Sequence, residues 1–151
     1  MTARERLAEL GVELPAMTPP LAAYIPAVRT GNHVYVSGQV PMEAGQPIAT
    51  GKVGAEVTPE RAKELAARSA LQLIAAVDAL VALEAVVRVV KVVGFVASAE
   101  GFTGQPAVIN GASEFLAEVF GEAGRHARSA IGVAELPLGV PVEVEAIFEI
   151  A

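Results

Sequence analysis

The sequence predicts one α+β domain in which a β-sheet carries two helices on one face and leaves the other face uncovered. Three observations predict it: a strand-turn-strand pattern near the N-terminus, two helical patterns that alternate with strands, and an excess of apolar residues. Hydrophobic residues make up 53% of the 151 residues, more than a domain of this size buries in its own core. We therefore expect the uncovered face to be an interface between subunits of an oligomer.

Residues 1–23 are expected to be an N-terminal extension. Charged and apolar residues alternate over residues 1–11, which predicts a short amphipathic helix and no signal peptide. An extended lead-in should follow, because proline disfavours regular structure. This lead-in covers residues 14–26 and so continues into the family core, and its prolines are Pro15, Pro19, Pro20 and Pro26.

A β-hairpin is predicted next. Residues 24–29 and 33–39 are rich in strand-forming side chains, and a turn signal separates them at Thr30-Gly31-Asn32. The glycine-rich residues 42–57 that follow should form a long loop.

Two helices are predicted on either side of a valine-rich strand. The first has Thr58 as N-cap and Pro59 at its first position, and its apolar residues recur on one face to about residue 81. Residues 86–96 are almost continuous valine and favour a central strand. The second helix should cover residues 108–120.

The C-terminal residues 127–150 read as two strands that carry the charged candidates for a site. Strand alternation places Arg128 on a face with small side chains, which is typical of an anion site. On the second strand Glu143, Glu145 and Glu149 share a face, and they would lie near Arg128 if the two strands pair. The alternative is a solvated polar face without a function.

Composition argues against several kinds of partner and site. A net charge of −6 disfavours nucleic-acid binding, and no apolar run approaches the length of a membrane span, about 18 residues. The absence of cysteine excludes a disulfide or thiolate site, and two histidines, His33 and His126, argue against a metal centre. We expect a cytoplasmic protein.

Several short segments, taken in order, resemble the RidA/YjgF family, the reactive-intermediate imine deaminases. The resemblance covers residues 24–151, the family core of a single domain that spans residues 1–151, and it includes the spacing from Arg128 to Glu143. The segments are Tyr24, residues 34–41, the valine-rich strand through Lys91, Ala127-Arg128-Ser129, Leu136-Pro137 and residues 142–146.

The resemblance implies a chorismate-mutase-like fold: an α+β subunit with a mixed β-sheet and two helices on one face. Three such subunits would form a homotrimer, a trimeric barrel with ligand clefts between neighbours. The small ligand would be an imine or keto acid that bears a carboxylate.

The implied activity is cofactor-free hydrolysis of 2-imino acids or their enamines to a 2-keto acid and ammonia, as in 2-iminobutanoate/2-iminopropanoate deaminases. No metal is needed, because a protonated imine carbon is already electrophilic. Arg128 would hold the substrate carboxylate and Glu143 would handle water, if burial raises the pKa of Glu143. Further substrate-binding residues would be Tyr24, Ser37, Gly38, Asn110 and Ala130.

Some of these positions leave alternatives open. Ser37 could bond the backbone at a strand end instead of the substrate, and His126 is either a surface residue or part of the site. Either Asn110 or Ser113 could match the asparagine that the family carries on its second helix.

Departures from the family pattern indicate a divergent branch with an extended N-terminus. Ile25 and Pro26 stand where the family commonly has Ser and Gln, and Ala130 stands where it often has Cys. A non-catalytic trimer that binds small carboxylates or has a regulatory role is therefore the alternative function. Endoribonuclease activity, a label also used for the family, is disfavoured by the acidic balance.

Overall fold

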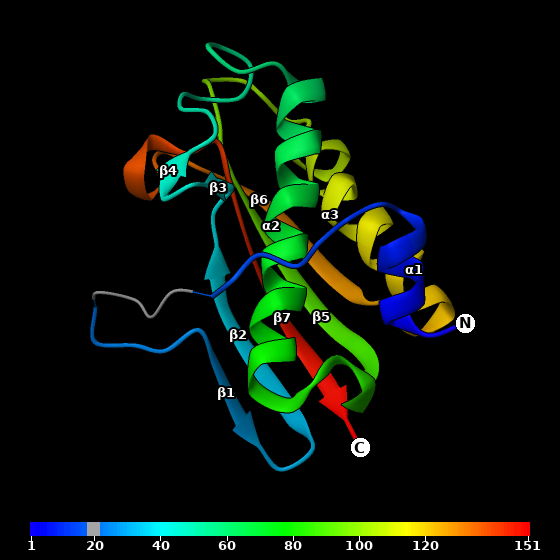
Figure 1. The fold of residues 1–151 in the computed structure, drawn as a ribbon. Helices are drawn as coiled ribbons and strands as arrows, with labels where there is room; N and C mark the ends of the chain where they lie inside the picture. Colours follow the sequence, from blue (N-terminus) through cyan, green and yellow to red (C-terminus); the bar gives the residue numbers. More distant parts are fainter. Residues whose placement is uncertain (18–21) are drawn as a thin grey trace.

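The computed structural model, which describes residues 1–17 and 22–151, contains a five-stranded sheet with helices on one side (Figure 1). The strand order is β1-β2-β7-β5-β6. Only β5 and β6 run parallel, so the sheet is mixed, as expected for this α+β fold. The strands are β1 (Ala27–Thr30), β2 (His33–Gln39), β5 (Val86–Ala97), β6 (Ala127–Val133) and β7 (Val142–Ile150).

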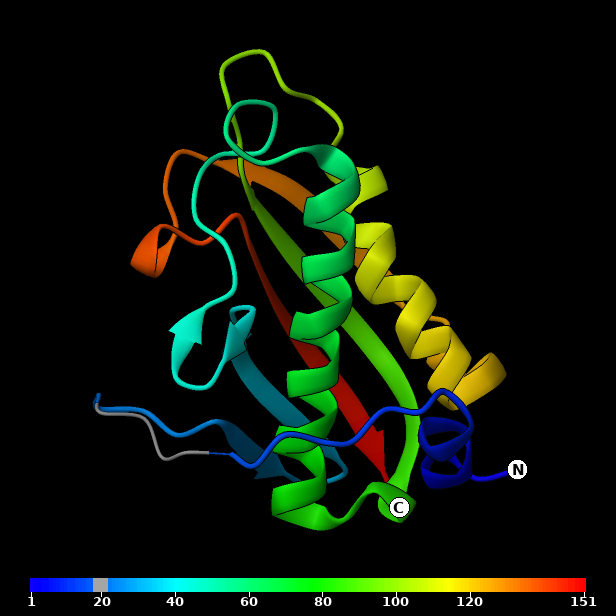
Figure 2. The same ribbon diagram turned by 45° about the horizontal axis from the view of Figure 1, so that its top comes forward.

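Both long helices cover the same face of the sheet, and the views of Figures 1 and 2 show no described segment over the other face. They are α2 (Pro59–Val81) and α3 (Gln105–Phe120). The predicted arrangement of two helices over one face is confirmed. Shorter elements are β3 (Met42–Glu43), β4 (Gln46–Pro47), and the 3₁₀ turns η1 (Leu83–Ala85), η2 (Gly121–Gly124) and η3 (Pro137–Gly139).

Helix α2 begins where its capping residues predict. The side chain of Thr58 accepts a hydrogen bond from the backbone N–H of Arg61 at 3.1 Å, and Pro59 follows it. Helix α3 starts three residues earlier than predicted, with a proline in its first turn, and ends at Gly121, whose φ is +64°.

The core lies between these helices and the sheet. Strand β7 alternates buried and half-buried residues along its whole length, which is the pattern of a strand with one covered face. Phe148 of β7 meets Phe120 of α3 edge to face, with ring centroids 6.1 Å apart. The inward residues of β7 are Val142, Val144, Ala146, Phe148 and Ile150.

The N-terminal residues fold onto the helical layer through α1 (Ala3–Glu9). Leu7 is buried, and Arg4 binds Asp78 at 2.7 Å and Glu84 at 2.6 Å. Pro19 and Pro20 of the predicted lead-in lie outside the described residues. No helix in residues 1–17 and 22–151 is both long enough and apolar enough to span a bilayer.

The expected proximity of Arg128 and Glu143 is wrong within one chain. Strands β6 and β7 do not pair, because β5 lies between them and pairs with both. Arg128 pairs with the buried Val92 and so faces the helices, whereas Glu143 pairs with Phe95 and lies on the uncovered face. The two side chains are therefore on opposite faces of the sheet.

Candidate functional site

Arg128 lies on β6, the strand at one edge of the sheet, and its guanidinium is bonded to helix α3. Nη1 donates to Oδ1 of Asn110 at 2.7 Å and to Oγ of Ser113 at 3.2 Å. Nη2 donates to the carbonyl of Pro106 at 3.4 Å. All three acceptors are neutral, so they orient the guanidinium without compensating its charge.

Helix α3 can supply these acceptors because residues three and four apart lie on one side of a helix. Asn110 and Ser113 were alternatives for the asparagine that the family carries on its second helix, and the structure shows that both contact Arg128. Within the described residues no Asp or Glu forms an ion pair with Arg128. Its charge is thus available to an external carboxylate.

His126 belongs to the same network. Its Nδ1 lies 2.7 Å from the carbonyl oxygen of Gly124, and its Nε2 lies 2.9 Å from Oγ of Ser113. Burial lowers the pKa of His126, and the positive charge of Arg128 lowers it further, against the opposing effect of the Gly124 bond. These effects favour the neutral imidazole.

Glu143 is a half-buried carboxyl on the uncovered face of the sheet. Burial raises its pKa above the usual 4.5, and repulsion from Glu145 raises it further. The role suggested for Glu143 from the sequence depended on burial raising this pKa, and the structure has that direction. A carboxyl with a raised pKa can both accept and donate a proton nearer to neutral pH.

Gly38 lies directly beneath the Glu143 side chain. A Cβ at Gly38 would stand 2.6 Å from Oε1 of Glu143, so only glycine leaves room for the carboxylate in this position. The ladder between β2 and β7 shifts register between Val36 and Gln39, as in a β-bulge. The shift also pairs Gln39 with Val144 on the helix-covered face.

Ser37 holds the lead-in against strand β2. Its hydroxyl donates to the carbonyl of Ile25 at 2.7 Å, and its backbone N–H donates to the carbonyl of Pro26 at 2.8 Å. The Ser37 hydroxyl thus donates its hydrogen to the backbone and not to a substrate, which is one of the two alternatives that the sequence left open. The same contacts bring Tyr24, which is 57% exposed, to the end of β2.

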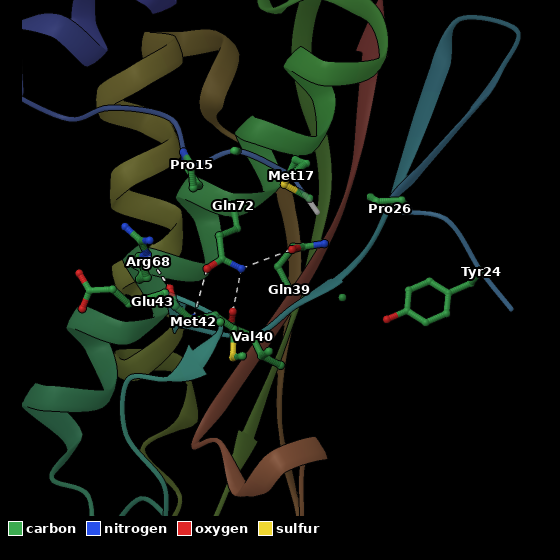
Figure 3. Close-up of a pocket in the computed structure, with 14 residues that line it drawn as sticks. Pro15, Met17, Tyr24, Pro26, Gln39, Val40, Met42, Glu43, Arg68 and Gln72 are labelled. Atoms are coloured by element: carbon green, nitrogen blue, oxygen red, sulfur yellow. Dashed lines mark hydrogen bonds between the residues drawn. The ribbon is translucent and has the colours of Figure 1, made fainter. Parts of the chain in front are cut away.

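Tyr24 and Gly38 line a pocket of about 320 Å³ between the lead-in, the β2–β4 region and α2. Figure 3 shows the Tyr24 ring extending toward it. Gln72 accepts from the backbone N–H of Met42 at 3.2 Å and donates to the carbonyl of Val40 at 2.8 Å. Arg68 donates to the carbonyl of Met42 at 3.2 Å.

Sequence reasoning missed Arg68 and Gln72, because it treated the first helix as a source of core residues. The available signal was their spacing of four, which places both side chains on one side of α2. Their hydrogen bonds shape one wall of the pocket.

The predicted residues therefore form two groups in one chain. Ala130 faces the helices beside Gly94, two residues beyond Arg128, so it joins the first group. We call His126, Arg128, Ala130, Asn110 and Ser113 the arginine site. We call Tyr24, Ser37, Gly38 and Glu143 the glutamate site. In the part of the chain that the structure describes, no three His, Asp or Glu side chains converge as metal ligands.

A family model described as endoribonuclease L-PSP matches residues 16–150. The chain belongs to this family. Protein TCP17 of Trypanosoma cruzi is 43% identical over 146 residues, which cover 95% of this chain and 91% of TCP17. The resemblance to the RidA/YjgF proteins is confirmed by this membership and by the solved structures.

Two solved structures show how the chain compares with proteins of similar fold. The protein Atu1372 from Agrobacterium tumefaciens is 45% identical with a TM-score of 0.90, covering 99% of this chain and 92% of its own. YjgF from Escherichia coli is 27% identical with a TM-score of 0.63, and the match covers 89% of this chain and 95% of YjgF. The match to Atu1372 thus extends through the N-terminal residues, and the match to YjgF leaves more of this chain uncovered.

Proposed function

We propose that the protein is a cofactor-free hydrolytic deaminase that converts 2-imino acids and their enamines to 2-keto acids and ammonia. The observation that carries the proposal is the Glu143 carboxyl, held over Gly38 with a raised pKa. A carboxyl with a raised pKa is better suited to proton transfer to and from water than an ordinary carboxylate. Membership of the L-PSP family and the unpaired charge of Arg128 support the proposal.

The proposal requires an oligomer, because the arginine site and the glutamate site lie on opposite faces of one chain, and we propose the homotrimer that the family resemblance implies. The uncovered face exposes large apolar side chains: Val28 is 48%, Tyr35 48% and Ile131 45% exposed. Such a surface favours association. Seating the β6 edge of one subunit against the uncovered face of its neighbour would bring the two sites to one ligand, as closed symmetry allows.

In the proposed reaction, Arg128 grips the substrate carboxylate and fixes C2 of the imine in the cleft. Water attacks C2 of the protonated imine while the Glu143 carboxylate takes a proton from that water. Glu143 then gives this proton to the nitrogen of the carbinolamine, and the C–N bond breaks as the Glu143 carboxylate takes the proton of the C2 hydroxyl to leave the keto group. Transfer of that proton to the departing ammonia releases ammonium and restores the carboxylate. Glu143 thus acts first as base and then as acid.

The test is an assay in which an amino-acid-consuming system releases 2-iminopropanoate and pyruvate or ammonia formation is followed. We expect acceleration by the wild type and loss of it in Arg128→Ala. No acceleration over buffer, or full activity in Arg128→Ala, would overturn the proposal. A sizing measurement that gives a monomer would remove the basis for a shared site.

A second candidate is a trimer that binds small carboxylates without turnover. It is favoured by the bond from Ser37 to Ile25, which engages a hydroxyl that would otherwise be free to donate to the substrate or water. Pyruvate bound at Arg128 in crystals, together with no imine hydrolysis in solution, would select this candidate over the enzyme.

A further inference from the structure

The hydrogen bond to Gly124 fixes which nitrogen of His126 carries the proton. A carbonyl oxygen can only accept, so at 2.7 Å from it Nδ1 must be the N–H nitrogen. In the neutral imidazole Nε2 then has only a lone pair to offer. The ring therefore presents an acceptor, and no donor, to the Ser113 hydroxyl.

The direction of the bond between Ser113 and His126 also sets the direction of the bond between Ser113 and Arg128. A serine has one hydroxyl hydrogen, and the 2.9 Å contact with Nε2 directs it to His126. The lone pairs of Oγ then face Nη1 of Arg128, which lies 3.2 Å away. Without this acceptor, a helical serine could turn its hydrogen toward the carbonyl four residues earlier in α3.

The network leaves one edge of the Arg128 guanidinium for a ligand. Asn110 and Ser113 together take both hydrogens of Nη1, which fixes the plane of the group. Among the described residues, no acceptor takes the hydrogen of Nε. Nη2 donates one of its two hydrogens to the carbonyl of Pro106, which lies on α3 with the acceptors of Nη1. The other Nη2 hydrogen and the Nε–H point the same way and match the two oxygens of a carboxylate.

We propose that His126, acting through Ser113, is a positioning residue that holds the Arg128 guanidinium with its Nε/Nη2 edge open to a carboxylate. The inference rests on the proposed role of Arg128 as the carboxylate site.

The test uses three single variants of the chain, the His126→Phe/Ser113→Ala double variant and two measurements. His126→Phe keeps a ring but removes the acceptor, His126→Gln supplies an amide acceptor at a similar distance, and Ser113→Ala breaks the link while leaving the imidazole. The exposed His33→Phe is the matched control. The measurements are ¹⁵N NMR of the Arg128 side chain and pyruvate affinity by calorimetry.

We expect the Nη1 signals of Arg128 to show faster rotation and hydrogen exchange in His126→Phe and Ser113→Ala. Pyruvate binding should weaken about fivefold to tenfold in each, with no further loss in the double variant, since both break one network. His126→Gln should stay within about twofold of wild type on the same reasoning, and His33→Phe should be unchanged.

Unchanged Arg128 signals and affinity in His126→Phe would overturn the inference, as would a His126→Gln variant as impaired as His126→Phe. The NMR measurement needs no ligand. If the wild type does not bind pyruvate, the proposed function fails, while the Arg128 signals still decide whether His126 positions the guanidinium.

Discussion

The arginine site and the glutamate site prepare their charged groups in opposite ways. At the arginine site, neutral hydrogen-bond acceptors of α3 orient a guanidinium whose charge has no carboxylate partner among the described residues. At the glutamate site, burial and Glu145 make ionisation of Glu143 less favourable. One site therefore offers a fixed positive charge, and the other offers an exchangeable proton.

In the proposed reaction, this difference would give binding to the first site and proton transfer to the second. A permanently charged fork suits a carboxylate that must not move during the reaction. A carboxyl with a raised pKa suits a group that changes protonation in each turnover. Variants at the two sites should thus affect different kinetic constants.

The largest effect is expected from Glu143→Gln. The amide keeps the shape of the side chain but cannot accept a proton, so turnover should fall about 10²–10⁴-fold while pyruvate binding persists. Steady-state kinetics in the imine assay and calorimetry with pyruvate measure the two effects. Loss of binding with retained turnover would reverse the roles assigned to the sites.

Arg128→Lys should produce the next largest effect. Lysine keeps the charge but loses the planar fork and the bonds to Asn110 and Ser113, so pyruvate affinity should fall about tenfold to a hundredfold. The calorimetric dissociation constant gives the answer. Equal affinity in the lysine variant would mean that charge alone, and not a bidentate contact, holds the ligand.

Gly38→Ala tests the geometry of the glutamate site with a smaller effect. The new Cβ would displace the flexible end of Glu143, so turnover should fall about tenfold. Unfolding free energy should change by less than about 1 kcal/mol, because the carboxylate end can move.

Gly111→Ala is the control for a glycine outside both sites. Its Cβ would meet the backbone of Lys63 in α2, which cannot move aside, so we expect a loss of about 1–3 kcal/mol in stability. Chemical denaturation of both variants checks the contrast. Equal destabilisation by the two alanines would show that Glu143 is held rigidly over Gly38.

Local features of this fold could be predicted from the sequence, whereas the arrangement of its strands could not. Thr58 and Pro59 located the start of α2, and the alternation of β7 identified the residues that face the core. Strand parity gives the face of a side chain but not the neighbouring strand. The position of β5 between β6 and β7 was therefore missed, and with it the separation of Arg128 from Glu143.

The bulge at Gly38 shows a second limit of sequence reasoning. Simple alternation placed Gln39 on the face of Tyr35, and the register shift between Val36 and Gln39 turns it to the other face. The candidate residues themselves came from the family resemblance. Spacing along the chain did not show that they divide between the two faces.

The smallest effect is the pH dependence of stability caused by Glu143. Its pKa is raised in the folded state, so above the unfolded value of about 4.5 the folded protein binds more protons than the unfolded chain. The contribution of Glu143 to the free energy of unfolding is fully present below the unfolded pKa and is lost as pH rises through the folded pKa. Glu143→Gln lacks this loss, so it should gain stability relative to wild type as pH rises above the unfolded pKa of about 4.5 and through the folded pKa.

Denaturant titrations of both proteins at several pH values measure this relative gain. Glu143→Gln should show this gain in stability together with its loss of turnover. Both effects have one cause, because burial of Glu143 destabilises the ionised carboxylate and thereby raises its affinity for a proton. A constant difference in unfolding free energy across this pH range would contradict the raised pKa. The glutamate site would then have no advantage in proton transfer over an exposed carboxylate.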